Sequence, residues 1–133
     1  MFPHIFFGVS DSDRAHDFHN AVLACVGLEL RFSDRSRPRA GWQSPGESRP
    51  LFFIGKRFDE NAPHRGNGQM VAFLANTQAP VDSTHTIALA HVGTCEGMPG
   101  LRPEYQFNDY GAYFCDLDGT SSVWPATFEA LNV

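Results

Sequence analysis

The sequence repeats its own pattern at a spacing of 66 positions, which carries residue 4 onto residue 70 of a 133-residue chain. Both halves contain a mostly apolar stripe at helical spacing, made of Ala15, Phe18, Val22, Leu23 and Val26 in the first half and Val81, Thr84, Ala88, Leu89 and Val92 in the second. A glycine follows each stripe, Gly27 or Gly93, as is common where a helix ends. Matching helices at a fixed offset predict a duplicated supersecondary unit, and this duplication restricts the fold more than any local pattern does.

The first half predicts one strand, one helix and three further strands. Residues 3–9 are mostly apolar and aromatic, which is typical of a strand, and Ser10 or Asp11 is placed to cap the helix that follows. Strands are then expected at 28–32, at 40–43 within a Ser-, Pro-, Gly- and Arg-rich stretch over 33–50, and at 51–54. We expect this first module to cover about residues 1–60.

The second half, about residues 67–133, predicts the same order of elements. Its first strand is expected at 70–75, and Asn76 or Thr77 is placed to cap its helix. Because residues 95–101 contain Gly97, Pro99 and Gly100, they are predicted to form a loop. The remaining strands are expected at 102–107, 110–115 and 120–124.

Composition argues against several classes of protein. The net charge of −5, without a long basic run, argues against nucleic-acid binding, and the longest apolar run is too short to span a membrane. The chain start also lacks the basic segment of a secretory leader. Cys25, Cys95 and Cys115 are odd in number and lack CxxC spacing, which favours reduced thiols in a cytoplasmic protein.

Three segments, in their order and spacing, resemble the vicinal oxygen chelate superfamily, which contains glyoxalases, bleomycin resistance proteins and extradiol dioxygenases. They are HIFFGVSD at residues 4–11, GNGQMVAFLA at 66–75 and YGAYFCDLDG at 110–119. The resemblance extends over nearly the whole chain and is closest to small glyoxalase-like members. It implies a single α+β domain over 1–133, in which two βαβββ modules form an incomplete barrel around a cleft, with the helices outside. It also implies a divalent metal that acts as a Lewis acid in the cleft.

The residues at the family's metal-ligand positions do not form a ligand set. The resemblance places these positions at His4, Met70 and Val123. A thioether and an isopropyl group cannot replace an imidazole and a carboxylate for a hard or borderline metal, and a lone histidine binds a metal weakly. His64 and Gln106 do not restore a triad. We therefore expect no metal and no other cofactor.

Alternation along the expected strands and the implied fold predict an aromatic and apolar cleft that suits a flat or aromatic ligand. Its expected ligand-binding residues are His4, Phe6, Trp42, Phe53, Met70, Tyr105, Tyr113 and Val123. Tyr113 falls where dioxygenase members carry an active-site tyrosine, so His4 and Tyr113 are the catalytic candidates; the alternative for Tyr113 is a core tyrosine. Arg39 is a further polar candidate. The arginines of the 33–50 stretch are expected mainly as solvated charge rather than as an anion site, and a lid formed by this stretch would shield Trp42.

Three functions from different classes fit these residues. The first and favoured one is a metal-free module that binds a small apolar or aromatic molecule. The second is a lyase or dioxygenase, working either through a metal held by His4 and unrecognised ligands or through a metal-free pair such as His4 and Tyr113. The third is a degenerate member that pairs with another chain, since the resemblance implies a homodimer. One fold supports many chemistries, so the resemblance does not choose among them.

Overall fold

The computed structural model describes residues 2–56, 71–101, 110–117 and 125–130. The first module consists of β1 (His4–Gly8), α1 (Ser12–Cys25), β2 (Glu29–Asp34), β3 (Arg39–Gln43) and β4 (Leu51–Gly55). Its sheet has the order β1-β4-β3-β2, in which β1 runs parallel to β4 and the other neighbours are antiparallel. The predicted order of elements in the first half is confirmed.

The second module consists of β5 (Val71–Ala75), α2 (Gln78–Ala90), β6 (Thr94–Leu101), β7 (Tyr110–Cys115) and β8 (Pro125–Ala130). Its sheet has the order β5-β8-β7-β6, and β5 runs parallel to β8. The topology of the first sheet is thus repeated strand for strand, which confirms the α+β fold of two βαβββ modules. The described strands form two open sheets rather than a closed barrel.

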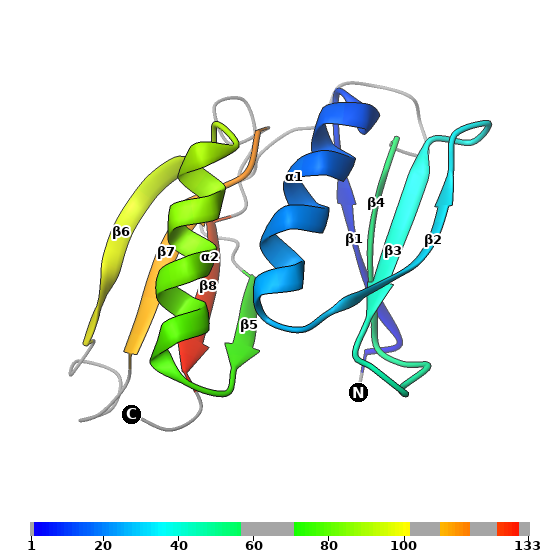
Figure 1. The fold of residues 1–133 in the computed structure, drawn as a ribbon. Helices are drawn as coiled ribbons and strands as arrows, with labels where there is room; N and C mark the ends of the chain where they lie inside the picture. Colours follow the sequence, from blue (N-terminus) through cyan, green and yellow to red (C-terminus); the bar gives the residue numbers. More distant parts are fainter. Residues whose placement is uncertain (1, 57–70, 102–109, 118–124, 131–133) are drawn as a thin grey trace.

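The two helices pack against each other and lie on the same side of the two sheets (Figure 1). Residues that face the helices from both sheets join one hydrophobic core. Ring contacts between described residues connect the modules, including those of Phe18 on α1 with Phe114 on β7 and of Phe52 on β4 with Phe73 on β5. Because strand side chains alternate between faces, the residues between these core positions lie on the other side of each sheet. No described helix is both long and apolar enough to cross a membrane.

The two helices end in different ways. The Asp11 carboxylate caps α1 by accepting a hydrogen bond from Arg14 N at 3.1 Å, and Gly27 follows α1 with a left-handed φ of +83°, both as predicted. After α2 the left-handed residue is Val92, with φ of 72°, and not Gly93. Gly93 is needed for a different reason, because a Cβ there would lie 2.8 Å from Ala88 O and 2.9 Å from the Phe18 ring.

Three local predictions in the second half are wrong or misplaced. Residues 95–101 are not a loop but most of β6, an edge strand whose pairing with β7 shifts register twice to accommodate its glycines. Leu89 and Val92, expected in the buried stripe of α2, are exposed, and Val92 lies beyond the end of the helix at Ala90. The last strand occupies Pro125–Ala130, where none was predicted, while the strands expected at 102–107 and 120–124 lie outside the described residues.

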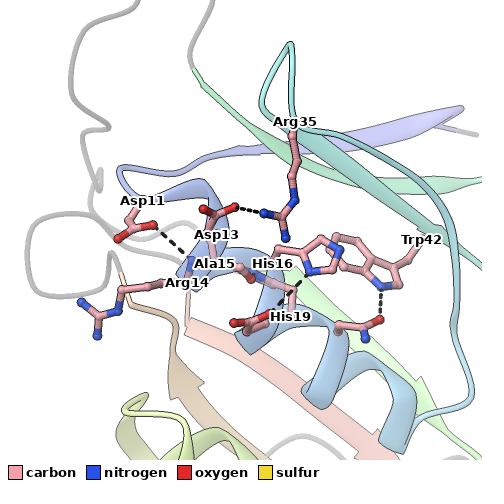
Figure 2. Close-up of polar contacts among 10 residues, drawn as sticks. Asp11, Asp13, Arg14, Ala15, His16, His19, Arg35 and Trp42 are labelled. Atoms are coloured by element: carbon pink, nitrogen blue, oxygen red, sulfur yellow. Dashed lines mark hydrogen bonds and ion pairs between the residues drawn. The ribbon is translucent and has the colours of Figure 1, made fainter.

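A buried polar pair lies where the modules meet. His19 Nε2 on α1 lies 3.5 Å from Asp116 Oδ2 at the end of β7, and both side chains are 6% exposed. Burial lowers the pKa of the His19 imidazole from 6.5 to about 4, although the hydrogen bond with Ala15 O opposes this shift. The ring is therefore neutral at pH 7, with Nδ1 donating to Ala15 O at 2.9 Å (Figure 2).

We predict that replacing Val92 by asparagine stabilises the protein. A β-branched residue is strained in the left-handed region, which asparagine tolerates, so Val92→Asn should raise the free energy of unfolding by about 1 kcal/mol. Val92 is 68% exposed, so little packing is lost. Urea denaturation measures the change. Val92→Thr is the matched control, because it adds polarity but keeps the β-branch; an equal gain from both variants would contradict the backbone explanation.

We predict that protonation of His19 destabilises the folded chain as the pH falls. The unfolded imidazole, with its ordinary pKa, takes up a proton that the buried ring resists, so stability is lost below pH 6.5. Between pH 7 and 4.5 this proton linkage should lower the free energy of unfolding by about 2 kcal/mol. In urea unfolding, the free energy of unfolding of wild type should fall by this amount more than that of His19→Asn. The amide of the asparagine can still donate to Ala15 O. Equal losses would mean that Asp116 stabilises a charged imidazolium.

Candidate functional site

Four aromatic side chains gather on the side of the first sheet that faces away from α1. We call this surface, formed by His4, Phe6, Phe32 and Phe53, the aromatic face. Phe53 is central, with ring centroids 5.2 Å from His4 and 5.5 Å from Phe32. Phe6 is 42% exposed and His4 is also exposed, so the described part of the chain leaves this surface open to solvent. Contiguous exposed apolar groups of this kind mark interaction sites more often than single ones do.

The register of the strands aligns these aromatic residues. Phe6 pairs with Phe53, Phe53 with Gly41, and Gly41 with Phe32, so one row of residues crosses all four strands. Gly41 leaves the space that the neighbouring rings occupy, because a Cβ there would lie 2.6 Å from Phe53 and 2.7 Å from Phe32. The rings of Phe53 and Phe32 therefore close over β3 from both sides. This glycine permits a nearly continuous aromatic surface.

The structure brings together only part of the predicted site. His4, Phe6 and Phe53 share the aromatic face, as alternation predicted. Tyr113 is half-buried on β7 of the second sheet, on the side opposite the core residues Ala112 and Phe114. Its alternation is as expected, but its catalytic role stays a prediction. Met70, Tyr105, Val123, His64 and Gln106 lie outside the described residues.

Trp42 does not share the aromatic face with Phe6 and Phe53, whereas its expected part in ligand binding stays a prediction. Because its strand neighbour Gly41 lies on the side of the aromatic face, Trp42 points to the helix side of the sheet and is 1% exposed. Its Nε1 donates a hydrogen bond to Asn20 Oδ1 at 3.1 Å (Figure 2). The stretch 33–50 also includes β3, which lies between β2 and β4 within the sheet. Trp42 is already shielded by its own module and cannot report closure of a lid.

Trp42 instead contributes to a groove between the modules that sequence reasoning missed. The groove has a volume of about 260 Å³. Its walls are mostly apolar and include Leu28, Trp42 and Phe52 from the first module and Val71 and Phe73 from the second. Only the packing of the two modules creates it, so no local sequence signal identifies it. Phe32 of the aromatic face was also missed, although its strand was predicted.

A polar cavity of about 420 Å³ lies at the N-terminal end of α1. Arg35, Arg39 and Lys56 line it, but so do the carboxylates of Asp11, Asp13 and Asp34. Arg35 Nη1 lies 3.6 Å from Asp13 Oδ1 with both side chains exposed, as Figure 2 shows. Asp34 accepts hydrogen bonds from Ser36 Oγ and from the backbone N–H groups of Ser36 and Arg37, and these lower the pKa of its carboxyl group.

The balance of charges around this cavity favours the interpretation that the arginines are solvated surface charge rather than an anion-binding site. Arg35 pairs with Asp13 there, and exposed ion pairs of this type contribute little. Arg31 and Arg49 also form hydrogen bonds with backbone carbonyl oxygens, those of Ser48 and Pro3. The arginines of the 33–50 stretch thus act mainly as local surface contacts. Arg39 lines this cavity, and alternation along β3 also puts its side chain on the same side of the sheet as the aromatic face.

The side chains at the family's ligand positions do not fit a divalent metal. Imidazole, thioether and isopropyl groups at His4, Met70 and Val123 offer one suitable donor. Among the residues that the structure describes, no three His, Cys, Asp or Glu side chains come together closely enough to hold an ion.

No family model and no curated protein matches the chain, but solved structures do. A glyoxalase/bleomycin resistance protein from Albidiferax ferrireducens T118 is 29% identical, with a TM-score of 0.79 over 96% of this chain and 98% of that one. A glyoxalase/bleomycin resistance protein/dioxygenase family enzyme from Burkholderia phytofirmans PsJN is 15% identical, with a TM-score of 0.67 and 97% of both chains covered. Lactoylglutathione lyase from Agrobacterium tumefaciens is 16% identical, with a TM-score of 0.61 over 98% of this chain and 93% of that one.

The second and third of these structures share the fold alone. The first adds sequence identity over nearly the full length of both chains to the same arrangement of two repeated modules. By fold and by this likeness, the chain is similar to members of the glyoxalase/bleomycin resistance protein/dioxygenase superfamily.

Proposed function

We propose that this protein binds a small, flat, apolar or aromatic molecule against the aromatic face without a bound metal. The observation that supports it is the row of rings across β1, β4, β3 and β2, which remains open to solvent on the side away from α1. Stacking and edge-to-face contacts with such rings favour an aromatic ligand over an aliphatic one of equal size. The superfamily assignment agrees with a site on a sheet surface but does not name the ligand.

His4 supplies the polar contact in this proposal. Its ring packs against Phe53 and remains exposed, so a hydroxyl or carbonyl group on a bound ring can reach an imidazole nitrogen. A site with one polar group among apolar ones orients its ligand by that group and draws affinity from the apolar contacts. This arrangement requires no Lewis acid. The alternative is a metal-dependent lyase or dioxygenase, and the metal content of the purified protein distinguishes the two.

The aromatic face is one wall of a site, and we propose that a second copy of the chain supplies the other wall. A flat surface buries only one side of a ring, whereas small-molecule sites enclose most of their ligand. A dimer that uses this surface would reduce the exposure of Phe6 and His4. Sedimentation of wild type and Phe6→Asp tests the pairing, since a charge at this position should shift a dimer to monomer; a monomeric wild type would contradict it.

We predict that 1-naphthol binds wild type and that Phe6→Ala weakens this binding about fivefold to tenfold, through loss of aromatic contact. The side chain of Phe6 is already 42% exposed, so its removal should not impair folding. His4→Ala should weaken binding of 1-naphthol more than binding of naphthalene, which lacks the hydroxyl group. Isothermal titration or ligand-detected NMR measures both affinities.

Phe73→Leu provides the control for this titration, because Phe73 lines the groove between the modules and not the aromatic face. We expect its affinity for 1-naphthol to equal that of wild type. Weaker binding in Phe73→Leu together with unchanged binding in Phe6→Ala would move the site to the groove and overturn the proposal for the aromatic face.

We also predict that tag-free protein retains no stoichiometric metal after incubation with Zn²⁺, Ni²⁺, Mn²⁺ or Fe²⁺ and dialysis, since a single imidazole holds such ions weakly. Mass-spectrometric metal analysis of wild type and His4→Ala makes the measurement. One metal ion per chain that disappears in His4→Ala would contradict the metal-free proposal and direct the work to lyase and dioxygenase assays.

A further inference from the structure

A thiol and an imidazole meet at the outer edge of the second module, away from the aromatic face. Cys95 Sγ on β6 lies 3.2 Å from His85 Nε2 on α2. The two residues face each other because Cys95 pairs in register with the core residue Phe114, which places its side chain on the helix side of the sheet. Cys95 is exposed whereas His85 is buried. The thiol thus belongs to a residue at the surface, while the base beside it is held in the protein.

Two further groups surround this pair. Asp82 precedes His85 by almost one turn of α2, and Tyr110 on β7 donates a hydrogen bond to Asp82 Oδ1. Burial lowers the pKa of His85, and the Asp82 carboxylate partly opposes that shift. Among the described residues, the groups that bear on the imidazole are therefore Cys95 from β6, Asp82 from its own helix and, through Asp82, Tyr110 from β7. At neutral pH the imidazole is uncharged and can accept the thiol proton.

The other two cysteines have different surroundings. Cys115 is 4% exposed, and its Sγ lies 3.7 Å from Glu96 Oε1, whose negative charge disfavours a thiolate. Cys25 is half-buried on α1 with Sγ 3.4 Å from Ala21 O, and burial raises the pKa of its thiol. Of the three cysteines, Cys95 is the one that is an exposed residue and whose sulfur lies at hydrogen-bond distance from a basic nitrogen.

We propose that Cys95 is a nucleophilic thiol, with His85 as its proton acceptor, that exchanges with small disulfides to form a mixed disulfide at the edge of the second module. The Cys95 thiol proton moves to His85 Nε2 as Sγ attacks one sulfur of the disulfide. The new bond joins Cys95 Sγ to that sulfur, and the other sulfur leaves as a thiolate. The leaving thiolate, or solvent, then takes the proton from His85. The incoming disulfide supplies the oxidising equivalents, so no further oxidant is needed.

This arrangement gives the reaction a distinctive pH dependence. An isolated thiol reacts through its thiolate, so its rate rises about tenfold for each pH unit below its pKa. Transfer of the proton to a neighbouring imidazole makes the reactive thiolate–imidazolium form a constant fraction between the pKa values of the two groups. The rate for Cys95 should therefore form a plateau in the neutral range.

The experiment follows the reaction of the folded protein with 4,4′-dithiodipyridine, a neutral disulfide, from pH 6.0 to 7.5. We expect the fastest phase in wild type to vary less than about fivefold over this range, and mass spectrometry to place the pyridylthio group on Cys95. In His85→Gln the rate at Cys95 should rise about thirtyfold over the same range. The same wild-type chain unfolded in urea, with ordinary thiols, should show the steep profile.

Asp82→Asn keeps the proposal falsifiable if His85→Gln does not fold, because Asp82 is exposed and an amide oxygen can still accept from Tyr110. Loss of the carboxylate makes His85 less basic, so the plateau rate should fall severalfold without a change of shape. A steep profile in folded wild type, first labelling at Cys25 or Cys115, or an unchanged plateau in Asp82→Asn would each overturn the proposal.

Discussion

The rings of Phe18 and Phe114, and those of Phe52 and Phe73, pack across the boundary between two repeated modules, and the rest of the structure depends on that shared core. Because both sheets turn their apolar sides to the helices, each sheet has one side committed to the core. The opposite side of the first sheet is then not part of this core. Its row of aromatic residues is not part of the shared core, which is why we propose that it binds a ligand.

The duplication made most of the fold predictable, whereas the site was only partly so. A repeated helical stripe and alternating strands predicted the two βαβββ modules and placed His4 and Phe6 on the correct side. Trp42 was misplaced because its strand is short, and its side is decided by pairing with Phe52 rather than by any pattern in β3 itself. The strand β6 was missed because Gly97, Pro99 and Gly100 indicate a turn, although an edge strand with bulges accommodates them. Cys95 and His85 meet only through packing of α2 on β6, which no motif encodes.

At single positions, the side chains of this chain differ from the metal ligands that the resemblance implies. An imidazole remains at His4, but a thioether and an isopropyl group stand at the other expected ligand positions, Met70 and Val123. With one suitable donor among the three, we expect no Lewis acid there, while the aromatic surface around His4 is present. A sheet surface lined with rings suits recognition of a flat molecule by stacking, because these contacts depend on ring geometry and not on a bound ion. Cys95 and His85 belong to a separate edge of the molecule and do not depend on this interpretation.

The most direct measurement of the central claim is a map of ligand-induced NMR shifts on protein with ¹³C-labelled aromatic and methyl groups. Addition of 1-naphthol should shift the ring signals of His4, Phe6, Phe32 and Phe53 along one saturable binding curve, while the methyl signals of Leu28 and Val71 in the groove stay fixed. Shifts confined to Leu28, Val71 and Phe73, with the rings of the aromatic face unaffected, would contradict the account.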